Sequence, residues 1–142
     1  MSHSDTIDIS VKELVSKFFT GGDLVFSSTG TNSAIDGNEI HSLWQNSRTE
    51  TYSAEVSVDH TFLQYQPAVR LRGRIDGLYT ARKTITIEEI KSTTLNPHEC
   101  AENPNSSHLA QLLVYGYLYG LQQKWSMSKS VCLNLVYVQA EL

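Results

Sequence analysis

Three side chains near the middle of the chain are of the types that could activate water for a hydrolysis reaction. Asp76 lies in the segment GRIDGLY, and Glu89 and Lys91 lie in IEEIKSTT. Glu89 and Lys91 are two residues apart, so on a strand they point to the same face of a sheet. Two carboxylates that share a face repel each other unless a cation neutralises them, and carboxylate oxygens suit Mg²⁺ or Mn²⁺. A lysine beside such an ion could orient a water molecule or stabilise the charge that develops on a phosphate.

The same residues also have a purely structural interpretation. A Glu-x-Lys triplet on a strand is commonly part of a solvated face. An aspartate that precedes a glycine, as Asp76 precedes Gly77, is commonly a turn residue. The two interpretations differ in whether the helices and strands that carry these residues bring the carboxylates together.

Apolar residues recur at helical spacing in three segments. Residues 10–19 form the first expected helix. A second helix is expected after residue 33, with Leu43 and Trp44 facing inward. The segment SHLAQLLVYGYLYGLQQKW, residues 107–125, is apolar nearly all round, so we expect it to be buried against a sheet.

Alternating apolar and polar residues mark the expected strands, which are residues 53–59, 68–79, 83–91 and 130–139. A polar, proline-containing stretch, residues 92–106, is expected to be a long loop before the last helix. The resulting order is ααβββαβ, which predicts a mixed α/β fold with a small twisted sheet flanked by helices.

The second and third of these strands are expected to form a hairpin through residues 80–82. Asp76 would then lie toward the far end of one strand and Glu89 at the end of the next, and we expect these ends to diverge. Sheet twist, or a bend at Gly73 or Gly77, would be needed to bring the two carboxylates together.

The composition limits the classes of partner. The chain has 142 residues, a length that predicts one domain over residues 1–142. Its 11 lysines and arginines against 15 aspartates and glutamates give a formal net charge of −4. A general electrostatic attraction to nucleic acid is therefore excluded, and any contact with nucleic acid must depend on a local basic cluster.

Zinc-binding, disulfide-rich, secreted and membrane-spanning classes of protein are not expected either. The two cysteines, Cys100 and Cys132, do not form a CxxC pair, so neither a zinc knuckle nor a disulfide framework is predicted. The first residues lack the pattern of a signal peptide, and no apolar run reaches the roughly 18 residues of a membrane helix. We expect a soluble, intracellular, cytoplasmic protein with no membrane partner.

A local basic cluster is present beside Asp76. Arg70, Arg72 and Arg74 share a face of the expected strand with Asp76 by period-two alternation. One interpretation is a solvated face whose long side chains cover apolar surface. The other is a DNA-binding track that leads phosphates toward the metal.

Together, the ordered motifs resemble those of the PD-(D/E)xK nuclease superfamily, in its RecB-like branch, where a helix His is followed by GxxD, ExK and QxxxY. The residues that carry the resemblance are His41, Gly73, Asp76, Glu89, Lys91, Gln111 and Tyr115. The segments GRIDGLY, IEEIKSTT and HLAQLLVYGYLYG look most like the nuclease domain fused to bacterial XPD/DinG-type helicases. The resemblance runs from about Val11 to Tyr137.

This resemblance implies a restriction-endonuclease-like core and a metal site for Mg²⁺ or Mn²⁺. Its ligands would be Asp76, Glu89, the backbone carbonyl of Ile90 and His41, and an imidazole ligand makes a site more tolerant of Mn²⁺. Glu55 matches a commonly acidic position of the branch. One-metal and two-metal versions are both compatible with these residues.

The remaining motif residues receive catalytic roles from the resemblance. Lys91 would position the attacking water, Gln111 would hydrogen-bond near the site, and Tyr115 would orient Lys91 or meet the DNA backbone. The proline of the family's name is absent, since Ile75 precedes the aspartate. Related CRISPR-adaptation nucleases hold an iron–sulfur cluster with four cysteines, and two cysteines cannot do so, which argues against such a cluster here.

The favoured function is therefore a Mg²⁺- or Mn²⁺-dependent DNA nuclease that acts on single strands or ends, in repair, recombination or mobile-element processing. No helicase motor is present, so we expect a fragment of a larger protein or a free-standing relative, with a helicase as a further partner. The alternatives are a silent nuclease fold that binds DNA or a helicase, and a dimeric junction resolvase. DNA against RNA, exonuclease against endonuclease, and oligomeric state stay open.

Overall fold

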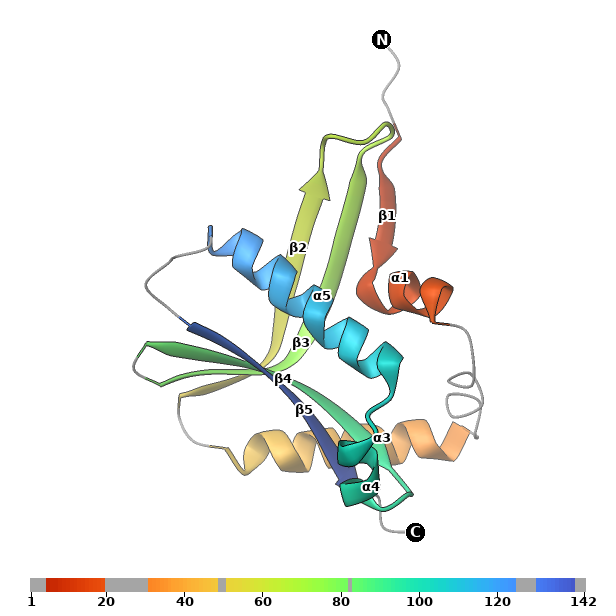
Figure 1. Cartoon of the computed structure of the whole chain (residues 1–142), viewed down its shortest axis with the longest axis vertical. Helices are drawn as coiled ribbons and strands as arrows, with labels where there is room; N and C mark the ends of the chain where they lie inside the picture. Colours follow the sequence, from red (N-terminus) through yellow and green to blue (C-terminus); the bar gives the residue numbers. More distant parts are fainter. Residues whose placement is uncertain (1–4, 20–30, 49–50, 82, 125–129, 140–142) are drawn as a thin grey trace.

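A five-stranded sheet with helices on both faces forms the described part of the protein, which in this computed structural model comprises residues 5–19, 31–48, 51–81, 83–124 and 130–139 (Figure 1). The elements in chain order are β1 (Ile7–Ser10), α1 (Val11–Phe18), α3 (Thr31–Asn46), β2 (Tyr52–Phe62), β3 (Val69–Ala81), β4 (Thr84–Thr93), α4 (Pro97–Glu102), α5 (Ser106–Gln122) and β5 (Ser130–Gln139). The expected mixed α/β architecture is confirmed.

Strand β3 is the centre of the sheet. It pairs antiparallel with β2 from Val69 to Tyr79. Along its other edge it pairs first with β1, parallel, at residues 69–72, and then with β4, antiparallel, at residues 77–81. Residues 73–76 therefore lie where β1 and β4 separate. Strand β5 extends the sheet by pairing parallel with β4 along its whole length.

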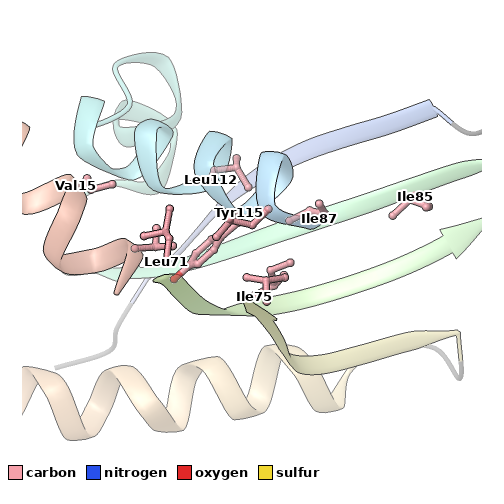
Figure 2. Close-up of a cluster of buried hydrophobic side chains, with 10 residues drawn as sticks. Val15, Leu71, Ile75, Ile85, Ile87, Leu112 and Tyr115 are labelled. Carbon is pink, nitrogen blue, oxygen red and sulfur yellow. The ribbon is translucent and has the colours of Figure 1, made fainter. Parts of the chain in front are cut away.

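Helices α1 and α5 cover one face of this sheet, and α3 lies on the other (Figure 2). The core between the sheet and the first pair of helices consists of buried apolar side chains from α1, β2, β3, β4 and α5. These are Val11, Val15, Val58, Leu71, Ile75, Ile85, Ile87, Leu112, Tyr115 and Leu118. Burying this set is the main source of stability for a sheet of this size.

Helix α1 illustrates how local sequence fixes the start of an element. Ser10 is its N-cap, and the side chain accepts a hydrogen bond from the backbone N–H of Glu13 at 3.1 Å. Val11 and Val15, one turn apart, are its buried residues. Strand β1, directly before it, was not expected, because four residues are too few for a clear alternation.

The expected loop over residues 92–106 is wrong in part, because it contains helix α4. Asn96 caps this helix by accepting a hydrogen bond from the backbone N–H of His98 at 2.9 Å, and Pro97 occupies its first turn. Proline suits that position because its missing N–H would have no helical partner there. Proline is also common in loops, so Pro97 by itself indicates a loop unless Asn96 is identified as the helix cap.

The expected burial of the last helix against the sheet is confirmed, since α5 packs on the sheet through Leu112, Tyr115 and Leu118. Its other side is exposed at Leu113 and Tyr117, which are 61% and 50% exposed.

One expectation about a helix face is wrong: Leu43 does not face inward, since 70% of it is exposed, although its neighbour Trp44 packs toward the sheet. In the described chain, no helix combines the length and hydropathy of a membrane span.

Candidate active site

The hairpin of β3 and β4 places Asp76 beside Glu89. Ala81 pairs with Thr84 and Gly77 with Glu88, and the pairing ends there, so Asp76 and Glu89 each lie one residue beyond the last pair. The two strands separate at this point, as expected, and the side chain of Asp76 reaches across to β4. Asp76 Oδ2 accepts a hydrogen bond from the backbone N–H of Ile90 at 2.8 Å, which fixes the carboxylate against β4 where β3 separates from it.

Glu89 is a buried carboxylate with an incomplete set of partners. It is 2% exposed, and its Oε1 lies 3.2 Å from Lys91 Nζ. Its Oε2 is also buried and has no hydrogen-bond partner among the described residues. Burial raises the pKa of Glu89 to about 7; Lys91 opposes this increase in pKa, and Asp76 adds to it. Buried polar atoms are nearly always satisfied, so this oxygen is available to a ligand that enters the groove.

Lys91 belongs to a chain of hydrogen bonds that runs into helix α5. Its Nζ donates to Gln111 Oε1 at 2.9 Å, and Gln111 Nε2 donates to Tyr115 Oη at 3.1 Å. Gln111 and Tyr115 can contact each other because they are four residues apart on a helix. Burial raises the pKa of Tyr115, so its hydroxyl stays protonated at neutral pH. The structure thus brings together three of the predicted catalytic residues, Lys91, Gln111 and Tyr115.

Gly73 makes room for this chain. A Cβ at Gly73 would lie 2.6 Å from Tyr115 Cε1 and 3.1 Å from Val11 Cγ2, both closer than such atoms normally approach. The first glycine of the GxxD motif therefore lets the Tyr115 ring lie directly on β3.

Helix α3 reaches the same place from the other face. Gln45 Nε2 donates to the backbone carbonyl of Asp76 at 2.8 Å and to Glu55 Oε1 at 3.1 Å. His41, one turn earlier, is partly buried and lines the same groove as Asp76. Burial lowers the pKa of His41, whereas the facing carboxylate of Asp76 raises it. Glu55 has φ 57°, a value rare for a non-glycine residue, at the point where β2 passes Asp76.

In the part of the chain that the structure describes, no three His, Cys, Asp or Glu side chains form a group that could hold a metal ion. The donors nevertheless fit a hard divalent cation, because the Asp76 and Glu89 carboxylates, from adjacent strands, line one groove, and Glu89 Oε2 is buried without a hydrogen-bond partner among the described residues. Asp76, Glu89 and the Ile90 carbonyl are the residues that would hold it. The role of His41 as a further ligand stays a prediction.

These residues open into a groove of about 870 Å³ that is also lined by Lys12 of α1 and by the three arginines of β3. Each arginine has an acidic partner. Arg72 Nε lies 2.7 Å from Asp8 Oδ1, and Arg74 Nε lies 3.7 Å from Glu55 Oε2. Arg70 pairs with Asp59 on β2 and, at 3.5 Å, with Asp8 on β1.

The three arginines, Arg70, Arg72 and Arg74, therefore face three carboxylates, and the six side chains together carry no net formal charge. The hydrogen bond from Arg70 also lowers the pKa of Asp59. This arrangement supports the solvated-face interpretation over that of a free positive track, and a DNA-binding role for the arginines stays a prediction. Lys12 was not predicted as a residue of the site, because nothing in a short amphipathic helix distinguishes one exposed lysine from another.

Glu88 is a second residue that the sequence did not single out. It is 1% exposed and points to the α3 face, opposite to Glu89. Its carboxylate accepts hydrogen bonds from Trp44 Nε1 and Asn134 Nδ2, both at 3.2 Å, and lies 3.4 Å from Arg48. This network ties α3 to β4 and β5, and so holds the helix that carries His41 and Gln45 in place.

Comparisons with known proteins agree with this geometry. A family model described as the PD-(D/E)XK nuclease superfamily matches residues 35–141, a range that includes every residue of the predicted site. No curated protein matches the chain.

Among solved structures, the crystal structure of SSO0001 is similar, with a TM-score of 0.64 and 19% sequence identity over 97% of this chain. The chain spans 65% of the length of that protein. At this identity the likeness concerns the fold alone. The family match, with the five-stranded mixed sheet flanked by helices, agrees with the expected restriction-endonuclease-like core.

Proposed function

The chain belongs to the PD-(D/E)XK nuclease superfamily, and from that premise we propose that it hydrolyses phosphodiester bonds of DNA with the help of Mg²⁺ or Mn²⁺. The observation that carries the proposal is the buried Oε2 of Glu89, near Asp76 and Lys91, for which the described part of the chain supplies no hydrogen-bond partner. A divalent cation held by these carboxylates would polarise the phosphate and lower the pKa of an attacking water.

Lys91 is the residue best placed to act on the reacting groups. An ammonium group has three N–H donors. Two of them are directed at Glu89 and Gln111, which leaves a third for a water or a phosphate oxygen. Hydrolysis forms a bond between the water oxygen and phosphorus while an ester P–O bond breaks and the leaving oxygen takes up a proton. The ammonium charge stabilises the additional negative charge on the phosphate during this step.

The neighbouring residues hold the lysine and the carboxylates in position. Gln111 and Tyr115 fix the direction of the Lys91 side chain through two hydrogen bonds on α5. Gln45 holds the backbone of Asp76, and the N–H of Ile90 holds its carboxylate. Such preorganisation matters because the polar groups need not reorient as charge develops.

Finer assignments are part of the same proposal. Single strands or DNA ends as substrates, and exonuclease action, are supported by the RecB-like motif set. The same motifs support a role in repair, recombination or mobile-element processing, in the cytoplasm and with a helicase as partner. His41 is proposed as a further metal ligand because it lies in the groove with Asp76.

A cleavage assay on labelled single-stranded and duplex DNA, with Mg²⁺, Mn²⁺ or EDTA, tests the proposal. We expect cation-dependent cleavage by the wild type, and a loss of about 100-fold or more in Asp76→Asn and Lys91→Ala. Lys17→Ala and Asp5→Asn are matched controls at exposed positions and should cleave like the wild type. If all five proteins give the same background cleavage, the proposed activity is wrong.

A second candidate is a silent nuclease fold that binds DNA without cutting it. Two observations favour it: the ion pair between Lys91 and Glu89, and the lack of a three-residue metal group in the described chain. Against it stands the cost of burying the Glu89 carboxylate with one oxygen unsatisfied, which a site without a ligand has no physical reason to maintain. DNA affinity that persists without any cation-dependent cleavage would support this candidate.

A further inference from the structure

A second pocket adjoins the groove on the other side of Lys91. Its volume is about 510 Å³, and its walls come from α1, the end of β4, the segment that contains α4, and the start of α5. Lys12 and Lys91 line both this pocket and the groove. The two spaces therefore meet at the proposed reaction centre.

The walls of this pocket combine apolar surfaces with a few polar groups. Val15, Phe19 and Leu95 contribute apolar side chains, and Ser92 and Asn103 contribute polar ones. A pocket of this size, with mainly apolar walls and a few polar groups, is typical of sites for small organic ligands or groups.

One wall is held rigid by hydrogen bonds. Tyr137 Oη lies 2.9 Å from His108 Nδ1 and accepts a hydrogen bond from the backbone N–H of Asn105 at 3.2 Å. The His108 and Tyr137 rings lie 5.7 Å apart, inclined by 50°. Because these contacts fix both rings, the shape of the pocket is already present before any ligand binds.

We propose that this pocket accepts an unpaired nucleobase of the nucleotide next to the scissile phosphate, an inference that rests on the proposed nuclease function. When a phosphate lies at Asp76, Glu89 and Lys91, the strand on one side of it follows the groove. The pocket that adjoins the groove at Lys91 would receive the base on the other side. The faces of a base are apolar and its edges are polar, which matches the walls.

A base pocket beside Lys91 restricts the substrates to DNA with an unpaired nucleotide at the cleavage site. A base that is stacked and paired inside a duplex cannot enter the pocket unless it leaves the helix. The substrates are therefore DNA strands with an unpaired nucleotide at the cleavage site: single strands, frayed ends or single-stranded tails. Blunt, stably paired duplexes should be poor substrates.

The wild-type protein provides the first test. Cleavage of oligothymidylate is compared with cleavage of a strand of equal length whose residues are abasic sugars, so that the phosphates are the same and only the bases differ. We expect kcat/KM to be about tenfold or more lower for the abasic strand, in line with the usual value of base stacking on protein side chains. Equal values for the two strands would overturn the proposal.

A variant that fills the pocket provides the second test. Ser16→Phe, at an exposed position of α1 that lines the pocket, places a ring into it, and Ser53→Phe is a matched substitution at an exposed position of β2 outside it. Ser16→Phe should lower kcat/KM for oligothymidylate about tenfold and leave that for the abasic strand unchanged, whereas Ser53→Phe should change neither. If Ser16→Phe slows both strands equally, or neither, the pocket does not hold a base. Leu95→Ala, which removes an apolar wall, is the second variant if Ser16→Phe does not fold, with the same two outcomes.

Failure of this inference differs from failure of the proposed function. If the nuclease proposal holds and the base pocket does not, both strands are cleaved equally and the reaction still depends on the cation and on Lys91. If the nuclease proposal itself is wrong, the wild type cleaves neither strand, and the base pocket is rejected with it.

Discussion

Replacing Glu89 with glutamine should stabilise the metal-free protein, and only at neutral and higher pH. The carboxylate is buried, and one of its oxygens has no hydrogen-bond partner among the described residues, so ionisation is costly inside the fold. The ordinary pKa of the group is 4.5, and the pKa of Glu89 in the folded protein is about 7. Because the folded state holds its proton more tightly than the unfolded state, stability falls as the pH rises from about 4.5 to about 7 and then levels off.

The size of the effect follows from the two pKa values. A difference of one between them corresponds to ~1.4 kcal/mol, so the ionised carboxylate lowers the free energy of unfolding by about 3 kcal/mol above pH 8. Glutamine has the shape of the protonated acid and does not ionise. We therefore expect Glu89→Gln to be about 3 kcal/mol more stable than the wild type at pH 8, and equal to it near pH 4.

Urea unfolding at several pH values, in EDTA and followed by circular dichroism, measures this difference. Subtracting the wild-type curve from the variant curve removes the titration of all other groups. Glu102→Gln, an exposed glutamate of α4, is the matched control and should show no such pH dependence. Mg²⁺ at pH 8 should stabilise the wild type and not Glu89→Gln, because a ligand that binds only the folded state raises its stability. A Glu89→Gln variant that is less stable at pH 8, or a difference independent of pH, would refute the reasoning.

Three further substitutions give expected outcomes. Glu88→Ala should lower the free energy of unfolding by about 3 kcal/mol in urea titrations, because it leaves buried donors without their acceptor; a loss below about 1 kcal/mol would contradict the network. Gly73→Ala should cost about 1–3 kcal/mol in the same assay, since its Cβ would overlap the Tyr115 ring, and unchanged stability would contradict this packing. Arg72→Ala should change DNA affinity little, because Asp8 already neutralises the guanidinium. A fall of about one in the slope of log affinity against log salt would instead identify a phosphate contact.

Much of the site could be predicted from local periodicity. The spacing of Glu89 and Lys91 placed them on one face of a strand, and the structure confirms this by the 3.2 Å between Glu89 Oε1 and Lys91 Nζ. The spacing of Gln111 and Tyr115 on a helix predicted a pair, and they are hydrogen-bonded. In both cases the two residues lie in one strand or one helix, so the regular geometry of that element is enough to predict that they share a face.

Relations between elements were harder to predict. The approach of Asp76 to Glu89 depends on where the pairing of β3 and β4 ends, at Gly77 and Glu88, and no local pattern in the sequence indicates that point. The neutralised arginines depend on β1, whose Asp8 lies some sixty residues earlier and pairs with Arg72 only after the sheet forms. The alternation of β4 predicts that Glu88 and Glu89 point to opposite faces. It does not predict that Trp44, which lies on a distant helix, donates a hydrogen bond to Glu88.

The central claim is that Asp76 and Glu89 hold one divalent cation with the Lys91 ammonium beside it. Crystals of the protein soaked in Mn²⁺ at about pH 8, where the Glu89 carboxylate is ionised, test this most directly. We predict a peak of anomalous density that contacts oxygens of both carboxylates. Well-ordered crystals with no such peak, and with Lys91 still paired to Glu89 as in the metal-free protein, would contradict it.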